Sequence, residues 1–88
     1  MTTNEERVVR IKSLLTEKLS PSEIEVRDES HLHIGHAGAK SGLGHFAVSI
    51  TAEAFMGKNL LQKHRMIYDA LGDMMQSDIH ALRIIRVN

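Results

Sequence analysis

"FMGKNLLQKHRMIYDAL", residues 55–71, and "IHALRI", residues 79–84, decide the fold of this chain. The first stretch and the residues just after it carry one stripe at helical spacing, made of Leu60, His64, Ile67, Leu71 and Met74 or Met75. This spacing predicts a helix that begins at Leu60 and ends near Ser77. The second stretch opens residues 79–87, which are rich in β-branched side chains and largely apolar on both faces. That pattern predicts a strand in the centre of a sheet.

Working back toward the N-terminus, the chain changes between helix and strand patterns. Residues 4–19 carry apolar side chains at helical spacing and follow a capping pair, Thr3 and Glu6, so they predict a first helix. Residues 24–28 and 46–51 alternate in polarity, which predicts two strands, and residues 53–57 can form one helical turn. The predicted order is α-β-β-α-α-β, which is one α+β domain over residues 1–88. Its helices are expected to pack on one face of a three-stranded mixed sheet.

The composition predicts a small domain without thiol chemistry. The chain has 88 residues, of which 42% are hydrophobic and none is cysteine, so it supplies no disulfide, thiolate ligand or cysteine nucleophile. Its apolar runs are too short to cross a bilayer and its N-terminus lacks a signal-peptide pattern, which predicts a cytoplasmic protein with no membrane contact. The 11 basic and 11 acidic residues cancel, whereas proteins that bind nucleic acid through phosphates usually carry a basic excess.

Histidines are concentrated between residues 31 and 45, in a segment of glycine, alanine and serine that has no helical or strand period and is predicted to be a loop. Neutral imidazole is a good ligand for borderline metals. Three interpretations of His31, His33 and His36 are therefore open: a self-contained zinc-type site, solvated side chains with no role, or donors to a metal that a partner also binds. A self-contained site would first have to order the loop, which costs conformational entropy.

Two other histidines are expected to be structural. His45 directly precedes the strand residue Phe46 and should point to the opposite side of the sheet, in a structural or surface position. His64 lies on the apolar stripe at the start of the long helix, which is typical of a capping or core-edge side chain.

The segments "HRMIY" (64–68) and "IHAL" (79–82), with "EVRDESHLH" (25–33) and "GHF" (44–46) upstream, resemble the signature of the BolA family over nearly the whole chain. The resemblance implies a fold like the class II KH domain. It also implies pairing with a monothiol, CGFS-type glutaredoxin in a heterodimer that can hold a two-iron two-sulfur cluster. In such a pair the glutaredoxin supplies a cysteine and a bound glutathione thiolate, so no cofactor is expected on the isolated chain. Some members of the family are DNA-binding transcriptional regulators that affect cell shape and stress responses.

The resemblance also assigns two ligands to this chain. His80 is the histidine of the IHAL motif, although the residue by itself, without the resemblance, favours a strand-end histidine bonded to a backbone carbonyl. The second donor comes from the loop, and its position is ambiguous. Counting forward from "DES" gives His33, whereas counting back from "HF" gives His36. His36 is preferred because its glycine neighbours let it reach farther from the sheet. A weak homodimer stays open.

The signals for nucleic-acid binding and for catalysis are weak. A KH domain holds backbone phosphates with a GxxG loop between two helices, and "FMGKNLLQKH" contains no such motif. Five basic residues are candidates for a modest nucleic-acid-binding surface: Lys58, Lys63, Arg65, Arg83 and Arg86. The alternative is that they are ordinary solvated charges. The sequence shows no nucleophile placed beside a base, no phosphate-binding loop and no H-E-x-x-H helix, so we expect no enzymatic activity.

Overall fold

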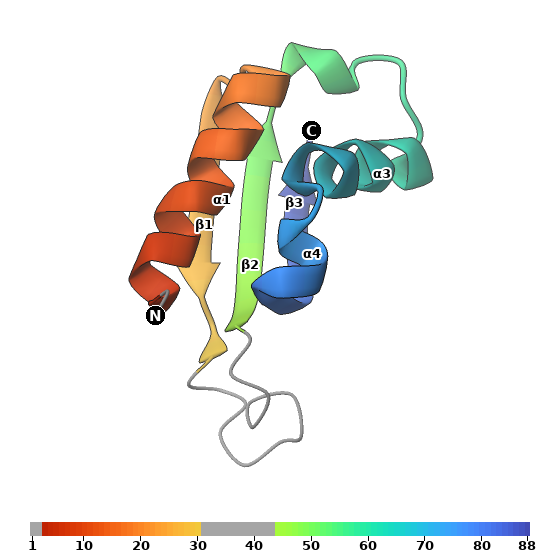
Figure 1. The fold of residues 1–88 in the computed structure, drawn as a ribbon. Helices are drawn as coiled ribbons and strands as arrows, with labels where there is room; N and C mark the ends of the chain where they lie inside the picture. Colours follow the sequence, from red (N-terminus) through yellow and green to blue (C-terminus); the bar gives the residue numbers. More distant parts are fainter. Residues whose placement is uncertain (1–2, 31–43) are drawn as a thin grey trace.

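A computed structural model of the protein describes residues 3–30 and 44–88, and the expected order of elements is confirmed (Figure 1). The predicted loop lies largely outside the described residues, and so do His31, His33 and His36. The helical turn expected after the second strand is a short 3-10 helix. The elements are α1 (Asn4–Leu19), β1 (Glu23–Asp28), β2 (Gly44–Thr51), η2 (Glu53–Phe55), α3 (Leu60–Leu71), α4 (Met74–Ser77) and β3 (Ile79–Val87).

Local side-chain hydrogen bonds fix the ends of the two long helices. The backbone N–H of Glu6 donates to Oγ1 of Thr3, as the capping pair predicted, and Ser20 ends α1 in the left-handed region with φ 47°. At the start of α3, Asn59 and Gln62 form a capping box in which each side chain accepts from the other residue's backbone N–H. These caps satisfy N–H groups that a helix cannot pair internally.

The sheet is mixed, with strand order β1-β2-β3. β1 and β2 are antiparallel, whereas β2 and β3 are parallel because η2, α3 and α4 carry the chain back before β3 begins. The prediction that residues 79–87 form the central strand is therefore wrong, since β2 lies between the other two and β3 is an edge. β-branched residues are favoured in edge strands as well as in central ones, so they do not distinguish the two positions. One β-branched residue of β3, Ile85, is 45% exposed.

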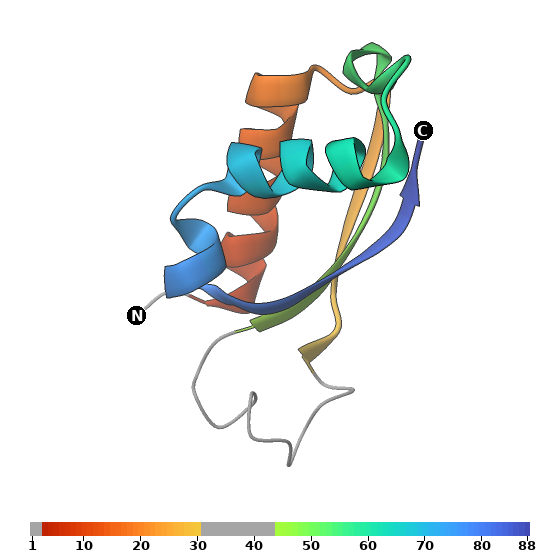
Figure 2. The same ribbon diagram turned by 90° about the vertical axis from the view of Figure 1, so that its right-hand side faces the viewer.

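All helices lie on one face of the sheet, and the single core is formed there (Figures 1 and 2). Ile11 and Leu15 from α1 and Ile67 and Leu71 from α3 share this core with the inward side chains of β2, which include Phe46. Alternate residues of β2 point to the other face of the sheet, which none of the helices within residues 3–30 and 44–88 covers. On this face, which we call the open face, Arg27, Ala47 and Arg83 lie in register across the three strands, with both arginines exposed and Ala47 buried.

The long helix predicted from Leu60 to Ser77 is two helices. α3 ends at Leu71, and Gly72, with φ 54°, turns the chain before α4 begins at Met74. A positive φ suits glycine, which has no Cβ, and the turn still leaves Met74 in the core. Leu60 belongs to the predicted apolar stripe but is 63% exposed, because the first turn of α3 projects beyond the edge strand β3 (Figure 1).

None of the helices among residues 3–30 and 44–88 is long and apolar enough to cross a membrane.

Candidate functional site

His80 is an extra residue in the pairing between β2 and β3. Gly44 is in register with Ile79 and His45 with Ala81, so His80 has no partner on β2. Such a bulge changes the direction of a side chain relative to the regular alternation. Ile79 points into the core, whereas His80 and Ala81 are both exposed. The bulge thus presents one imidazole to solvent at the beginning of β3.

His45 lies against His80. The centroids of the two rings are 5.0 Å apart and their planes are tilted by 51°. His45 is only 6% exposed, so the exposed ring of His80 packs against a buried one. The expectation that His45 is structural agrees with this burial. Its contact with His80 was not foreseen, because the bulge that brings the rings together leaves no signal in the sequence.

Hydrogen bonds hold the backbone of His45 on both sides. Its N–H donates to Oγ of Ser30 over 3.0 Å, and its carbonyl accepts from the N–H of Glu29 over 2.7 Å. The same Ser30 oxygen accepts from Nδ2 of Asn4 at the start of α1, over 3.2 Å. The start of α1 and the end of β1 therefore fix the position of His45, which in turn contacts His80.

Asp78, two residues before His80, is a second fixed point. Its carboxylate accepts a hydrogen bond from the hydroxyl of Ser77 and another from Nε of Arg7, over 3.2 Å. Only 9% of its side chain is exposed. The Ser77 hydrogen bond, opposed by burial and supported by Arg7, lowers the pKa of Asp78 from its usual value of 3.8. Asp78 is thus an anion at neutral pH, and it ties the start of β3 to α1.

The predicted basic residues separate into two groups. Arg83 and Arg86 lie on the open face of the sheet and are both paired. Arg83 makes two bonds to Glu29, of 3.0 and 2.5 Å, which raise its pKa, and Nη2 of Arg86 is 3.7 Å from Glu23. The other group, formed by Lys58, Lys63 and Arg65, lies on α3 and the turn before it. The five side chains therefore do not form one continuous basic surface.

The chemistry available at this end of the sheet is that of an imidazole donor. His80 is exposed and can reach a metal held by another protein, whereas His45 is covered. Within the described ranges, no three histidine, cysteine or acidic side chains are grouped closely enough to hold a metal ion. A metal bound by His80 would thus need further donors from outside this part of the chain. His64 lies half-buried on α3 and is not grouped with them.

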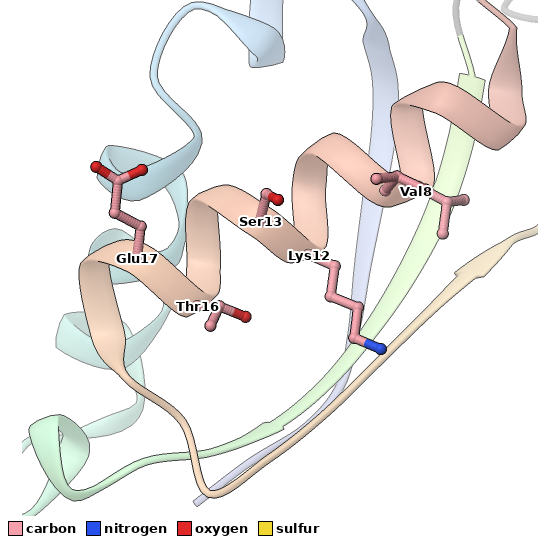
Figure 3. A pocket seen from close by; sticks show the side chains of 6 residues that line it. Val8, Lys12, Ser13, Thr16 and Glu17 are labelled. Carbon is pink, nitrogen blue, oxygen red and sulfur yellow. The ribbon is translucent and has the colours of Figure 1, made fainter.

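The outer flank of α1 carries a shallow depression. It is lined by Val8, Val9, Lys12, Ser13, Thr16 and Glu17, all from one helix (Figure 3). A hollow formed by one helix alone does not bring together groups from different elements, and this one contains no histidine. We therefore place the candidate site at His80 and not on α1.

Comparison with known proteins gives consistent matches. A family model described as BolA-like protein matches residues 15–86. Among curated relatives, SufE-like protein 1 of Arabidopsis thaliana is 43% identical over 84 residues, which is 90% of this chain and 23% of the relative. Protein BOLA1 of the same plant is 37% identical over 84 residues, which is 92% of this chain and 52% of the relative. The chain thus spans about a quarter and about half of these two relatives. The DNA-binding transcriptional regulator BolA of Escherichia coli is 37% identical over 75 residues, 85% of this chain and 69% of the relative.

Solved structures agree with these matches. The BolA domain of SufE1 from Arabidopsis thaliana superposes with a TM-score of 0.79 at 43% identity, covering 92% of this chain and 90% of that one. BolA1 from the same plant gives a TM-score of 0.77 at 36% identity, covering 92% and 89% of the two chains.

Proposed function

The chain belongs to the BolA-like family, and on this premise we propose that it is a non-enzymatic accessory protein of iron–sulfur assembly that pairs with a monothiol, CGFS-type glutaredoxin. The cargo of the pair is a two-iron two-sulfur cluster, which the heterodimer holds or transfers. One relative, whose name describes it as SufE-like, carries a BolA domain similar to this chain.

The observation that carries this proposal is the exposed imidazole of His80, held by a bulge against the buried ring of His45. Imidazole is a suitable ligand for iron. Since the chain has no cysteine, thiolate ligands must come from the glutaredoxin and its glutathione. His80 supplies one nitrogen, and His36, or alternatively His33, supplies the second. Imidazole in place of thiolate generally raises the reduction potential of such a cluster.

Co-expression with a monothiol glutaredoxin tests this proposal. We expect the two proteins to co-elute after anaerobic purification with glutathione, with a cluster spectrum that differs from that of the glutaredoxin alone. His80→Ala should alter the spectrum, while His64→Ala, which removes a half-buried histidine from α3, should leave it unchanged. A spectrum identical to that of the glutaredoxin homodimer, with none of this chain co-eluting, would refute the proposal.

DNA binding is the second candidate, because a relative with 37% identity is named a DNA-binding transcriptional regulator. Of the five basic residues predicted to contact nucleic acid, Lys58, Lys63 and Arg65 remain available for phosphates, since Arg83 and Arg86 face glutamates. With a net charge of zero, we expect weak binding at about 150 mM salt. Tight, sequence-selective binding by the isolated chain at that salt concentration would reverse the order of the two proposals.

The cytoplasm remains the compartment that we propose. Two of the relatives carry chloroplastic or mitochondrial in their names, so fractionation of the source cells is the direct test. Recovery of the chain in an organelle fraction would replace this assignment.

A further inference from the structure

Exposed apolar side chains are concentrated on α3 and the turn before it. Across the described part of the chain, six large hydrophobic residues are exposed, and four of them lie within residues 56–68. We call these four the η2–α3 surface: Met56 (80% exposed), Leu60 (63%), Leu61 (61%) and Tyr68 (38%). Single exposed apolar residues are common, but a group of them indicates a contact surface.

The surface is already ordered in the free chain. Leu61 and Tyr68 are seven residues apart on α3, so they lie on the same side of the helix two turns apart, with Arg65 between them. The capping box of Asn59 and Gln62, with bonds of 2.8 and 2.9 Å, fixes the first turn that carries Leu60 and Leu61. A partner would therefore not have to order this helix when it binds.

The charge on this surface has one sign. No acidic residue occurs between Glu53 and Asp69, whereas Lys58, Lys63 and Arg65 lie between them. Across the described residues, none of these three cations is within 4.0 Å of a carboxylate, although Arg7, Arg27, Arg83 and Arg86 each are. The η2–α3 surface therefore combines apolar contact area with cations that no carboxylate neutralises.

From this combination we infer that the η2–α3 surface docks an acidic amphipathic helix of a partner protein. The apolar side of such a helix covers Met56, Leu61 and Tyr68, and its carboxylates meet Lys58 and Arg65. Helices commonly bind other helices through anchors at this spacing. Four exposed apolar side chains favour a protein partner over DNA, because phosphates contact cations and gain nothing from leucine and methionine.

This surface is remote from His80. The N–H of Ala52, just before η2, donates to the carbonyl of Asn88 over 2.9 Å, which places η2 at the far end of β3. Eight residues of extended chain separate Asn88 from His80, or about 25 Å. Figure 1 shows η2 and the beginning of β3 at opposite ends of the domain. The helix can therefore dock while another protein occupies the histidine site, and the inference does not depend on the proposed function.

The test uses a labelled peptide of about 18 residues, five turns of helix, with leucines at every third or fourth position and glutamates elsewhere. We expect saturable binding to the full chain in fluorescence anisotropy. Leu61→Ser should weaken it by about tenfold or more, and Arg65→Gln should weaken it and reduce its dependence on salt. The matched controls, Val9→Ser and Lys12→Gln, change exposed residues of α1 and should leave the affinity unchanged.

Several results would overturn the inference. A peptide with lysine in place of glutamate that binds equally well would remove the role of charge. Preference for duplex DNA or for phosphatidylglycerol vesicles over the peptide would assign the surface to another class of ligand. A dimer of this chain that Leu61→Ser dissociates, or loss of glutaredoxin pairing in that variant, would show that the surface is already occupied.

Discussion

The buried ring of His45 lies 5.0 Å from the exposed ring of His80, so the first residues of two neighbouring parallel strands meet at the candidate site. His45 is fixed by Ser30 and Glu29 through its backbone, whereas His80 protrudes from a bulge. The contact gives the protruding ring a rigid neighbour.

Replacing His45 should disturb His80 without unfolding the domain. His45→Leu puts an apolar side chain of similar size in this buried position, but it removes the ring that His80 contacts. We expect the imidazole NMR signals of His80 in the isolated chain to shift and broaden, with little change in the far-ultraviolet circular dichroism. Unchanged His80 signals in this variant would show that the ring contact has no orienting effect.

Gly44→Ala should destabilise the domain. A Cβ at Gly44 would lie 2.3 Å from two ring carbons of Phe46 and 3.0 Å from Oδ1 of Asn4. Because Phe46 is buried in the core, its ring has little room to move, and we expect a loss of about 1–3 kcal/mol in the free energy of unfolding. Urea titration measures this loss. The double variant with Phe46→Leu has room for the new methyl group and should lose less than the two single changes together.

Arg7→Met should also destabilise the domain, by about 1–3 kcal/mol, because it leaves the carboxylate of Asp78 buried without its cation. Lys12→Met, which changes an exposed cation on the same helix, provides the control. Equal stabilities of the two variants in urea would show that the Arg7–Asp78 pair makes no net contribution.

Asp78 should make stability depend on pH in the acidic range. Its pKa is lower in the folded protein than the usual 3.8, so the unfolded chain binds its proton first as the pH falls. This contribution to stability is complete well above pH 3.8 and is lost as the pH falls from there through the folded pKa. Asp78→Asn should therefore flatten the acidic side of the stability profile, measured by urea unfolding between neutral pH and the acid limit. An acidic slope equal to that of the unmodified chain would contradict this account.

The two loop histidines can be separated by substitution. If His36 is the second donor, His36→Ala should change the spectrum and stability of the cluster in the glutaredoxin heterodimer, while His33→Ala and His31→Ala leave it nearly unchanged. His80→Ala should damage the cluster at least as strongly, with the domain still folded. An intact histidine-ligated spectrum in the His33/His36 double alanine variant would exclude the loop as a ligand source.

The sequence predicted what depends on local periodicity. The spacing of Ile11, Leu15 and Leu19 placed α1 and its buried side, and the alternation from Phe46 to Ile50 placed β2 and its inner face. These patterns arise because burial repeats with the period of the element. Together with the IHAL and HRMIY motifs, they were sufficient to predict the fold and the family.

Features that depend on tertiary pairing could not be predicted in this way. The bulge at His80 depends on the register between β2 and β3, which are separated in the sequence by η2, α3 and α4. The edge position of β3 likewise depends on where the crossover returns. At Gly72 a local signal was present, since glycine often ends a helix, but the apolar Met74 continued the stripe and concealed the break. The contact between His45 and His80 follows from the bulge.

The pairing of β2 with β3 has a second register shift, at Ile85, besides the one at His80. Both shifts affect the tendency of the protein to aggregate. Both extra residues, His80 and Ile85, lie on β3, the edge strand whose outer backbone groups could accept a strand from another molecule. A regular edge of nine residues would be a template for such addition, whereas bulges interrupt it and increase its twist. The bulge that exposes His80 thus also disfavours pairing between the edge strands of two molecules.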